Sequence, residues 1–187
     1  MGRLIVKDLP IEGLKLIERQ PIGDNRGFFS RIFCADELIV CGWEHPIAQI
    51  NHSFTAEKGT VRGLHYQHAP YTEMKLVTCL AGEIWDVAVD VRANSPTFLT
   101  WHAERLSAKN NCALLIPEGV AHGFQTLTDN VQLLYCHSTA YQKNAETGLN
   151  VTDPRLGISW PLPVSECSMR DQSFPLLDAL FTGEKTK

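Results

Sequence analysis

Two histidines in glycine-containing segments are the residues best suited to proton transfer. His65 lies within residues 61–67, and His122 lies in the turn-rich segment 117–124. Imidazole titrates near neutral pH, so either ring can act as a base without a large change in its pKa. A lone strand histidine is more often structural, but Lys75 stands nearby in an otherwise apolar segment, where a cation needs a partner. The combination predicts an active site lining a β-barrel.

The same histidines also allow a metal site. Residues 117–122 match Pro-x-Gly-x-x-His and resemble the second signature of the cupin superfamily of small β-barrels. The first signature of its metal-binding members is His-x-His followed by a glutamate, and here Gln67 occupies the second histidine position. A neutral amide is a poor ligand for a transition metal. His65, Glu73 and His122 remain as an incomplete set of ligands, so a metal-dependent cupin enzyme is an alternative hypothesis.

Short segments of alternating polar and apolar residues predict the strands that must position these side chains. The expected strands are 28–34, 47–53, 60–67, 74–80, 83–91, 98–106, 112–116, 123–127 and 131–139. Their connections carry Gly, Pro, Asn and Asp, a pattern typical of an all-β sandwich or barrel rather than of alternating strands and helices. Helix is expected only at 35–41, before a glycine, and at 173–181 near the C-terminus.

Alternation also predicts which side chains share a face of the sheet. The segment 131–139 places Tyr135 on the same face as its other odd-numbered residues. In the segment that carries His65, the same rule leaves Arg62 on the opposite face. Both side chains can enter one site only if Gly63 supplies a bulge or bend, which a residue without Cβ tolerates.

Length and composition indicate one globular domain, residues 1–187. The chain is 44% hydrophobic and carries a formal net charge of −4, which argues against a nucleic-acid partner because such proteins usually present a clustered basic face. No run of about 18 apolar residues is present, so no membrane contact is expected. The N-terminus lacks the apolar core of a secretory signal. The six scattered cysteines are therefore expected to be reduced thiols in a cytoplasmic protein.

Longer motifs lie in order along roughly residues 24–178. They are Arg26-Gly27-Phe28-Phe29, Gln49-x-Asn51-His52-Ser53, Val61-Arg62-Gly63-Leu64-His65-Tyr66-Gln67, Asp86-Val87-Ala88-Val89-Asp90, Ile116-Pro117-Glu118-Gly119-Val120-Ala121-His122-Gly123-Phe124, and Gly157-Ile158-x-Trp160-Pro161. Together they closely resemble the nucleotide-sugar epimerase family typified by dTDP-4-dehydrorhamnose 3,5-epimerase. The resemblance implies an all-β, cupin-like double-stranded β-helix, or jelly-roll barrel, with short C-terminal helices. It also implies an isomerase that uses neither a cofactor nor a metal.

The resemblance implies a reaction and roles for four catalytic residues. The substrate would be a nucleoside-diphosphate 4-keto-6-deoxyhexose, and protons would be removed and returned beside the ketone, at C3 and C5. His65 would be the base, oriented by Asp171 as a carboxylate–imidazole dyad. Lys75 would stabilise the enolate oxygen, and Tyr135 would deliver a proton from the other side.

The resemblance also implies a set of substrate-binding residues and a homodimer. The binding residues would be Arg26, Phe29, Gln49, Asn51, Arg62, His122, Glu146 and Arg170. Guanidinium groups suit phosphate oxygens because their donors form a fork. In the expected homodimer, the N-terminal strand region of one subunit helps to line the pocket of the other.

Two positions depart from the family pattern. Arg31 stands where members often carry a glutamate, which leaves open whether the nucleotide is dTDP, CDP, GDP or UDP. Ala140 lies in a tract that is usually richer in aromatic residues, which leaves open whether C3, C5 or both carbons are epimerised. Besides the metal-dependent dioxygenase or isomerase, a non-catalytic sugar-nucleotide binding protein is a third hypothesis.

Overall fold

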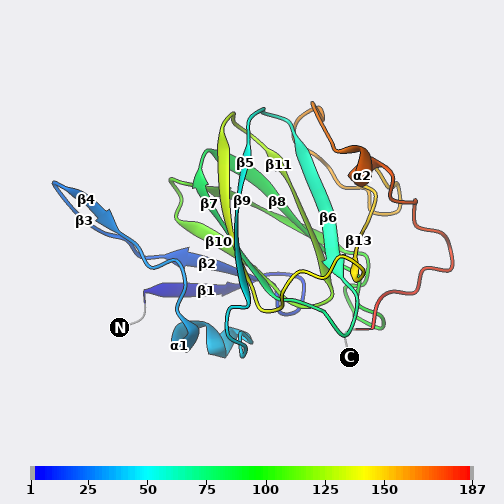
Figure 1. Ribbon diagram of the computed structural model, residues 1–187, viewed down its shortest axis with the longest axis horizontal. Coiled ribbons are helices and arrows are strands. Elements are labelled where there is room, and N and C mark those ends of the chain that lie inside the picture. The colour runs from blue at the N-terminus through cyan, green and yellow to red at the C-terminus, as the bar shows by residue number, and fades with distance from the viewer. Residues whose placement is uncertain (1–2, 186–187) are drawn as a thin grey trace.

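Two antiparallel sheets form the body of the protein (Figure 1). The computed structural model describes residues 3–185. The six-stranded sheet has the order β1 (Leu4–Asp8), β2 (Lys15–Arg19), β10 (Cys112–Ile116), β7 (Lys75–Ala81), β12 (Val131–His137) and β5 (Gln49–Thr55). The five-stranded sheet has the order β13 (Glu146–Gly148), β6 (Val61–Gln67), β11 (Val120–Thr126), β8 (Glu83–Asp90) and β9 (Trp101–Ser107). The prediction of an all-β fold is confirmed.

The remaining elements are short. A hairpin of β3 (Ile22–Asp24) and β4 (Gly27–Phe29) is followed by α1 (Ala35–Leu38) and a 3-10 turn, η1 (Ile39–Cys41). The predicted helical turns at 35–41 are therefore confirmed, and they end at Gly42 in the left-handed conformation. The only other helix in residues 3–185 is α2 (Met169–Gln172). None of the helices described is long and apolar enough to cross a membrane.

Apolar side chains cover both faces of each sheet. Between the sheets lies a core to which both contribute, including Val77, Ile84, Leu106, Leu114, Val120 and Leu133. The outer face of the six-stranded sheet packs against α1 and the turn that follows it, including Leu38 and Trp43. The outer face of the five-stranded sheet is covered by residues of the chain beyond β13, including Leu149, Val151, Leu156, Leu177 and Phe181. Burial on both faces explains why several strands read as nearly continuous apolar runs.

The inward-facing residues change character along the strands. On β12, Val131 and Leu133 belong to the core between the sheets, whereas Tyr135 and His137, further along the same face, line a cavity. On β7, Lys75 lines that cavity and the later inward-facing residues are apolar. The predicted face of Tyr135 is confirmed. One end of the interior is therefore a packed core, and the other end is a polar site.

A bulge in β6 lets two polar side chains of this strand, Arg62 and His65, line the same cavity. His65 pairs with His122 of β11. Arg62 pairs with Phe124, so β6 carries one residue more than β11 between these two pairs. Gly63 lies in this interval with a φ of 131°, a conformation that suits a residue without Cβ. The bulge predicted at Gly63 is confirmed, and both Arg62 and His65 line the cavity.

Several strand boundaries differ from the prediction, and two of the differences are the largest or bear on the site. The strand expected at 28–34 ends at Phe29, and the chain then leaves the hairpin toward α1. The strand expected at 123–127 begins earlier, at Val120, so His122 belongs to the strand rather than to the turn before it. The strands β1, β2, β3 and β13 were not predicted from the sequence.

The helix predicted at residues 173–181 is wrong. Two of its backbone groups are bound by side chains from the loop after β13 and are therefore not available for helical hydrogen bonds. The side chain of Asn150 donates to the carbonyl of Phe174 at 2.8 Å. The carboxylate of Asp153 accepts the backbone N–H of Leu177. The segment is held against the barrel by these contacts, and the helix forms just before it, at α2.

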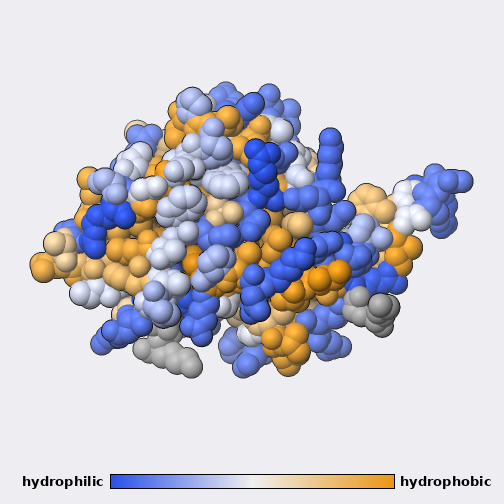
Figure 2. Space-filling view, turned by 180° about the vertical axis from the view of Figure 1, so that it is seen from behind, coloured by the Kyte–Doolittle hydropathy of each residue, from blue (hydrophilic) through white to orange (hydrophobic). Residues whose placement is uncertain are grey.

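The hairpin β3–β4 stands clear of the body in both views (Figures 1 and 2). Phe28 and Phe29 on β4 are 72% and 67% exposed. Phenylalanine rarely remains this accessible without a partner, so the hairpin presents an unusual apolar surface to its surroundings.

The Gly63 bulge leads to a stability prediction with a matched control. A Cβ at Gly63 would lie 2.4 Å from the Cα of Gly123, whereas a Cβ at Gly27, with a φ of 135°, would meet nothing within 4 Å. Both substitutions to alanine strain the backbone, but only Gly63→Ala also forces two strands apart. We expect Gly63→Ala to lower the free energy of unfolding by at least about 2 kcal/mol more than Gly27→Ala in urea titrations. Equal losses would contradict this account of the bulge.

Candidate active site

A cavity of about 610 Å³ opens at the polar end of the barrel. Most of the residues predicted to form the site line it: Gln49, Asn51, Arg62, His65, Lys75, His122, Tyr135 and Glu146. They come from β5, β6, β7, β11, β12 and β13, so both sheets contribute. Asp171 and Arg170 line a second hollow that shares Arg62 and His65 with the first.

His65 and Asp171 form the predicted carboxylate–imidazole dyad. His65 Nε2 lies 2.7 Å from Asp171 Oδ1, and the backbone N–H of Gly63 donates to Oδ2 at 3.2 Å. Ser168 caps α2 by accepting the N–H of Asp171, which fixes the carboxylate beside β6. Burial would raise the pKa of Asp171, but the His65 ring and these donors outweigh it and hold the pKa below its ordinary value. Asp171 is therefore ionised at neutral pH and can orient the ring.

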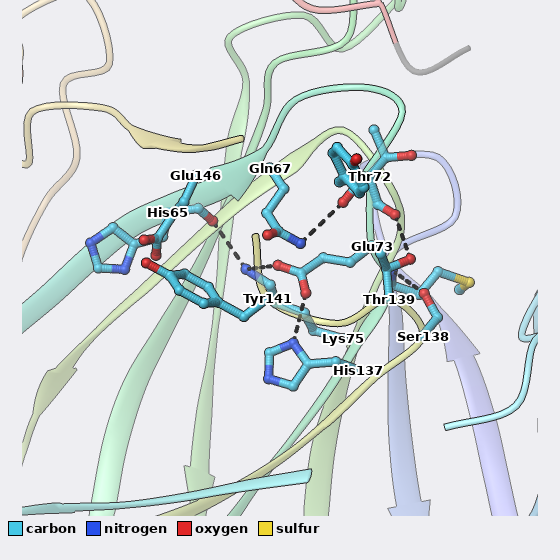
Figure 3. Close-up of polar contacts among 12 residues, drawn as sticks. His65, Gln67, Thr72, Glu73, Lys75, His137, Ser138, Thr139, Tyr141 and Glu146 are labelled. Carbon is cyan, nitrogen blue, oxygen red and sulfur yellow. Dashed lines mark hydrogen bonds and ion pairs between the residues drawn. The ribbon is translucent and has the colours of Figure 1, made fainter. Parts of the chain in front are cut away.

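Lys75 is buried in the cavity wall and has two fixed partners (Figure 3). Its ammonium lies 3.1 Å from Glu73 Oε1 and donates to the backbone carbonyl of His65 at 3.2 Å. The second oxygen of Glu73 lies 2.8 Å from His137 Nδ1. Burial would raise the pKa of Glu73, but Lys75 and His137 together lower it. A cation in this apolar strand is thus explained by a buried carboxylate partner.

Tyr135 lies on the opposite sheet from His65, and its hydroxyl is inside the barrel. The hydroxyl is 3.2 Å from Ser53 Oγ, and the ring contacts His122 edge-on at a centroid distance of 6.2 Å. Burial raises the pKa of Tyr135 well above its ordinary value, although Ser53 and the charge of Arg62 act in the opposite direction. The phenol therefore keeps its proton at neutral pH and can donate it.

His122 belongs to a second carboxylate–imidazole pair. Its Nε2 lies 2.6 Å from Asp86 Oδ1, and Asp86 is wholly buried. Burial raises the pKa of Asp86, and the nearby His122 and Lys75 only partly offset this effect. Within the described residues, the other oxygen of Asp86 has no hydrogen-bond partner. Asp86 was not predicted as a site residue, although a carboxylate in an apolar strand gives the same signal that identified Lys75.

The two sheets place the acid–base groups on opposite sides of the cavity. His65 and His122 lie on β6 and β11 of one sheet, whereas Lys75 and Tyr135 lie on β7 and β12 of the other. A molecule between the sheets would therefore meet an imidazole base on one face and a phenol on the other. This arrangement can remove a proton from a carbon, stabilise the resulting anion and return a proton from the opposite side.

Polar side chains at the mouth of the cavity suit an anionic ligand. Gln49 donates to Asn51 at 3.0 Å, and Arg62 donates to Thr55 Oγ1 at 3.3 Å. Arg170 forms an ion pair with Glu146 at 2.7 Å, and its side chain is half exposed. Arginine binds carboxylates and phosphates through paired donors, so Arg62 and Arg170 can hold a phosphate group at this edge.

Arg26 and Phe29 do not lie in this cavity of their own chain. Both are on the β3–β4 hairpin, where Arg26 pairs with Asp24 at 2.5 Å. The substrate-binding role predicted for them therefore depends on a second chain. Among the lining residues that were not predicted for a catalytic or substrate-binding role are Glu73 and His137.

The side chains considered as metal ligands each contact a different partner. His65 contacts Asp171, His122 contacts Asp86, and Glu73 contacts Lys75 as well as a histidine. In residues 3–185, no group of three or more His, Cys, Asp or Glu side chains is arranged to hold a metal ion.

Comparisons with known proteins agree with this geometry. A family model described as dTDP-4-dehydrorhamnose 3,5-epimerase matches residues 8–179. The protein of that name from Salmonella typhimurium is 41% identical over 184 residues, covering 96% of this chain and 99% of that protein. The crystal structure of dTDP-4-dehydrorhamnose 3,5-epimerase from Bacillus anthracis, with TDP and PPi bound, is 38% identical with a TM-score of 0.89, covering 93% of this chain and 99% of the other.

A further solved structure contains a sugar nucleotide. It is dTDP-6-deoxy-D-glucose-3,5-epimerase from Legionella pneumophila in complex with dTDP-4-keto-L-rhamnose, which is 38% identical with a TM-score of 0.89 and covers 97% of this chain and 98% of the other. Fold and relatives together define an enzyme of the isomerase class built on a cupin-like jelly-roll barrel. The chain belongs to the dTDP-4-dehydrorhamnose 3,5-epimerase family. The expected fold and family are confirmed.

The dyad leads to a prediction for stability as a function of pH. The pKa of Asp171 is lowered in the folded state, so its contribution is full above the ordinary carboxyl pKa of about 3.9 and is lost as pH falls through the folded value. We expect Asp171→Asn to lower the free energy of unfolding at pH 7 by about 2 kcal/mol, the value of a hydrogen bond to a charged group. The difference from wild type should shrink below about pH 4.

Urea titrations at several pH values measure this difference, and Asp24→Asn is the matched control. Asp24 is paired with Arg26 on the exposed hairpin, where an ion pair adds little to stability. A loss in Asp171→Asn that does not change with pH would show that the carboxylate charge is not involved.

Proposed function

We propose that this chain, as a single domain of residues 1–187, epimerises a dTDP-linked 4-keto-6-deoxyhexose at C3 and C5. The observation that carries the proposal is the His65–Asp171 dyad, which faces Lys75 and Tyr135 across the cavity between the sheets. The names of the relatives and the sugar nucleotide in the Legionella structure support the substrate class. The same reaction class acts in making deoxysugar precursors of polysaccharides such as lipopolysaccharide.

The first step is proton abstraction from a carbon beside the C4 ketone. The carbon–hydrogen bond breaks, His65 takes the proton, and the electron pair moves into an enolate with its charge on O4. Asp171 holds the ring in place and stabilises the imidazolium that forms. Lys75 donates to O4, and a buried ammonium does so more strongly than one in water. His122 lines the same cavity as Lys75 and would bind the sugar there.

The second step returns a proton to the other face of the same carbon. Tyr135 is on the opposite sheet from His65, so its proton reaches the face that the base does not touch. The phenolate that forms lies beside Ser53 and recovers a proton while His65 releases the one it took. Substrate and product are isomers, so no electrons are gained or lost and no cofactor is consumed.

The remaining predicted residues hold the sugar nucleotide. Arg62 and Arg170 lie where the cavity opens, and their donors match the oxygens of a diphosphate. Gln49, Asn51 and Glu146 supply amide and carboxylate groups that can bind the sugar or the base. These contacts would fix the carbon to be attacked within reach of His65.

The functional unit we propose is a cytoplasmic homodimer in which the β3–β4 hairpin of one subunit reaches the pocket of the other. Phe28 and Phe29 would then be covered, and Phe29 would stack on the nucleotide base. The edge strand β5 also exposes Ile50 and Phe54, at 59% and 54%, beside this cavity. Arg31, at the base of the hairpin, pairs with Glu37 and so fixes where the hairpin leaves the body. A reducing compartment suits six cysteines that are all free thiols.

Isotope exchange tests the two acid–base roles separately. In deuterated water the wild type should incorporate deuterium beside the carbonyl and invert the same carbon, and His65→Ala should do neither. Tyr135→Phe should still exchange deuterium, because His65 can return a hydrogen to the face from which it removed one. Formation of the inverted sugar should fall by about 10²-fold or more. NMR of the recovered sugar measures both. Exchange in His65→Ala equal to wild type would reject the proposed mechanism.

A complementation experiment tests the shared pocket. Arg26→Ala and His65→Ala should each be nearly inactive alone. If hairpin and base come from different subunits, a mixed dimer has one intact site, so random mixing should restore about a quarter of wild-type activity. Mixing His65→Ala with Asp171→Asn is the control, since both changes lie in the same pocket and no intact site can form. Recovery in neither mixture would show that Arg26 does not act across the interface.

A further inference from the structure

Glu73 is a buried carboxylate that the mechanism has not used. Figure 3 shows it between two basic side chains of the cavity wall, Lys75 and His137. One oxygen lies 3.1 Å from the Lys75 ammonium and the other lies 2.8 Å from His137 Nδ1. The side chains of Glu73 and Lys75 are each only 9% exposed. Both oxygens of the carboxylate are therefore occupied, and the pair is shielded from bulk water.

The contacts of Lys75 leave one donor for a ligand. An ammonium group has three N–H donors. One is directed to Glu73, and a second goes to the backbone carbonyl of His65 on the opposite sheet. A lysine side chain otherwise rotates freely on its four-carbon stem, so anchors on two sides aim the third donor into the cavity.

His137 braces Glu73 from the neighbouring strand. Its Nε2 is 3.4 Å from Asn51 Nδ2, which fits a ring that carries its proton on Nδ1 and donates it to Glu73. The ring also stacks on Tyr135 with an interplanar angle of 26°. A continuous chain of contacts thus runs from β12 through Glu73 to Lys75.

We propose that Glu73 is a positioning residue for the reaction, braced by His137, which keeps Lys75 protonated and aims its free N–H at the enolate oxygen. The inference rests on the proposed function, because it assigns Lys75 the oxygen of the ketone. It adds to that function a dedicated carboxylate whose role is to maintain the cation, as distinct from Asp171, which serves the base.

The groups around Lys75 leave Glu73 as its ion-pair partner. Two other carboxylates lie nearby: Asp86 on β8 contacts His122 on β11, and Glu146, which lines the same cavity, pairs with Arg170. The remaining titratable neighbours, His65, His137 and Tyr135, are bases or a phenol and supply no negative charge of their own. Among residues 3–185, Glu73 is the only carboxylate in ion-pair contact with the ammonium. Removing the charge of Glu73 would leave a buried ammonium without that ion-pair partner.

Glu73→Gln tests the inference, since it keeps the size of the side chain and removes its charge. Kinetic isotope-exchange assays should show kcat reduced by about tenfold to a hundredfold, the cost of a misplaced catalytic group, with little change in KM. The alkaline limb of the pH profile should move to lower pH by about 1 to 3 units, because the opposite charge is gone. Glu104→Gln is the matched control: Glu104 also pairs with a histidine, His102, but on β9 away from the cavity. It should behave as wild type.

A second measurement needs no turnover. In protein labelled with ¹³C at lysine Cε, the Lys75 resonance can be assigned by its loss in Lys75→Arg, and it should titrate at lower pH in Glu73→Gln than in wild type. This readout tests the inference even if wild type shows no isotope exchange and the proposed function fails. An alkaline limb and a Lys75 titration both unchanged in folded Glu73→Gln would overturn it.

A third variant covers the case in which Glu73→Gln does not fold. His137→Leu keeps both charges of the ion pair and removes only the brace. It should reduce kcat several-fold and move the alkaline limb in the same direction by a smaller amount. A kcat and an alkaline limb equal to those of wild type in His137→Leu would then overturn the inference.

Discussion

The close approach of two antiparallel sheets is the constraint on which the rest of this structure depends. Every side chain that points inward from one sheet must fit against those of the other, so the interior holds either complementary apolar groups or paired polar ones. The chain divides these along the strands: on β12, Leu133 packs in the core and Tyr135 enters the cavity. The same division places an imidazole and a phenol in one cavity, because each sheet contributes one of them.

Pairing is what makes the polar half of the interior stable. His65, Lys75 and His122 each contact a buried carboxylate, and these carboxylates come from three different parts of the chain. Such buried pairs contribute little to the free energy of folding compared with an apolar core, because both charges lose their hydration. Their benefit is fixed orientation: groups that are already aligned need no rearrangement when charge develops on a bound molecule.

Much of the barrel and part of the site could be predicted from the sequence, for physical reasons. Alternation identified most strands and the face of Tyr135, and an unexpected cation identified Lys75. Asp171 could not be found this way, because it is 106 residues from His65 and lies in a polar segment without a local signal; only the ordered motifs of the family indicated it. Asp86 was overlooked although it gives the same signal as Lys75.

The wrong prediction of a helix near the C-terminus has a similar explanation. Residues 173–181 have a helical pattern, but side chains of the loop after β13 bind their backbone, and such non-local competition is invisible in a short window of sequence. Glu73 and His137 were missed as a pair because they come from a loop and a separate strand.

The long separation between His65 and its carboxylate has a consequence for biosynthesis. A ribosome exposes His65 well before it has made Asp171, so a product that ends between them after Gly148 carries every strand described here and lacks the carboxylate that contacts the imidazole. Under the proposed mechanism, activity would begin only when synthesis has passed the segment that carries Asp171.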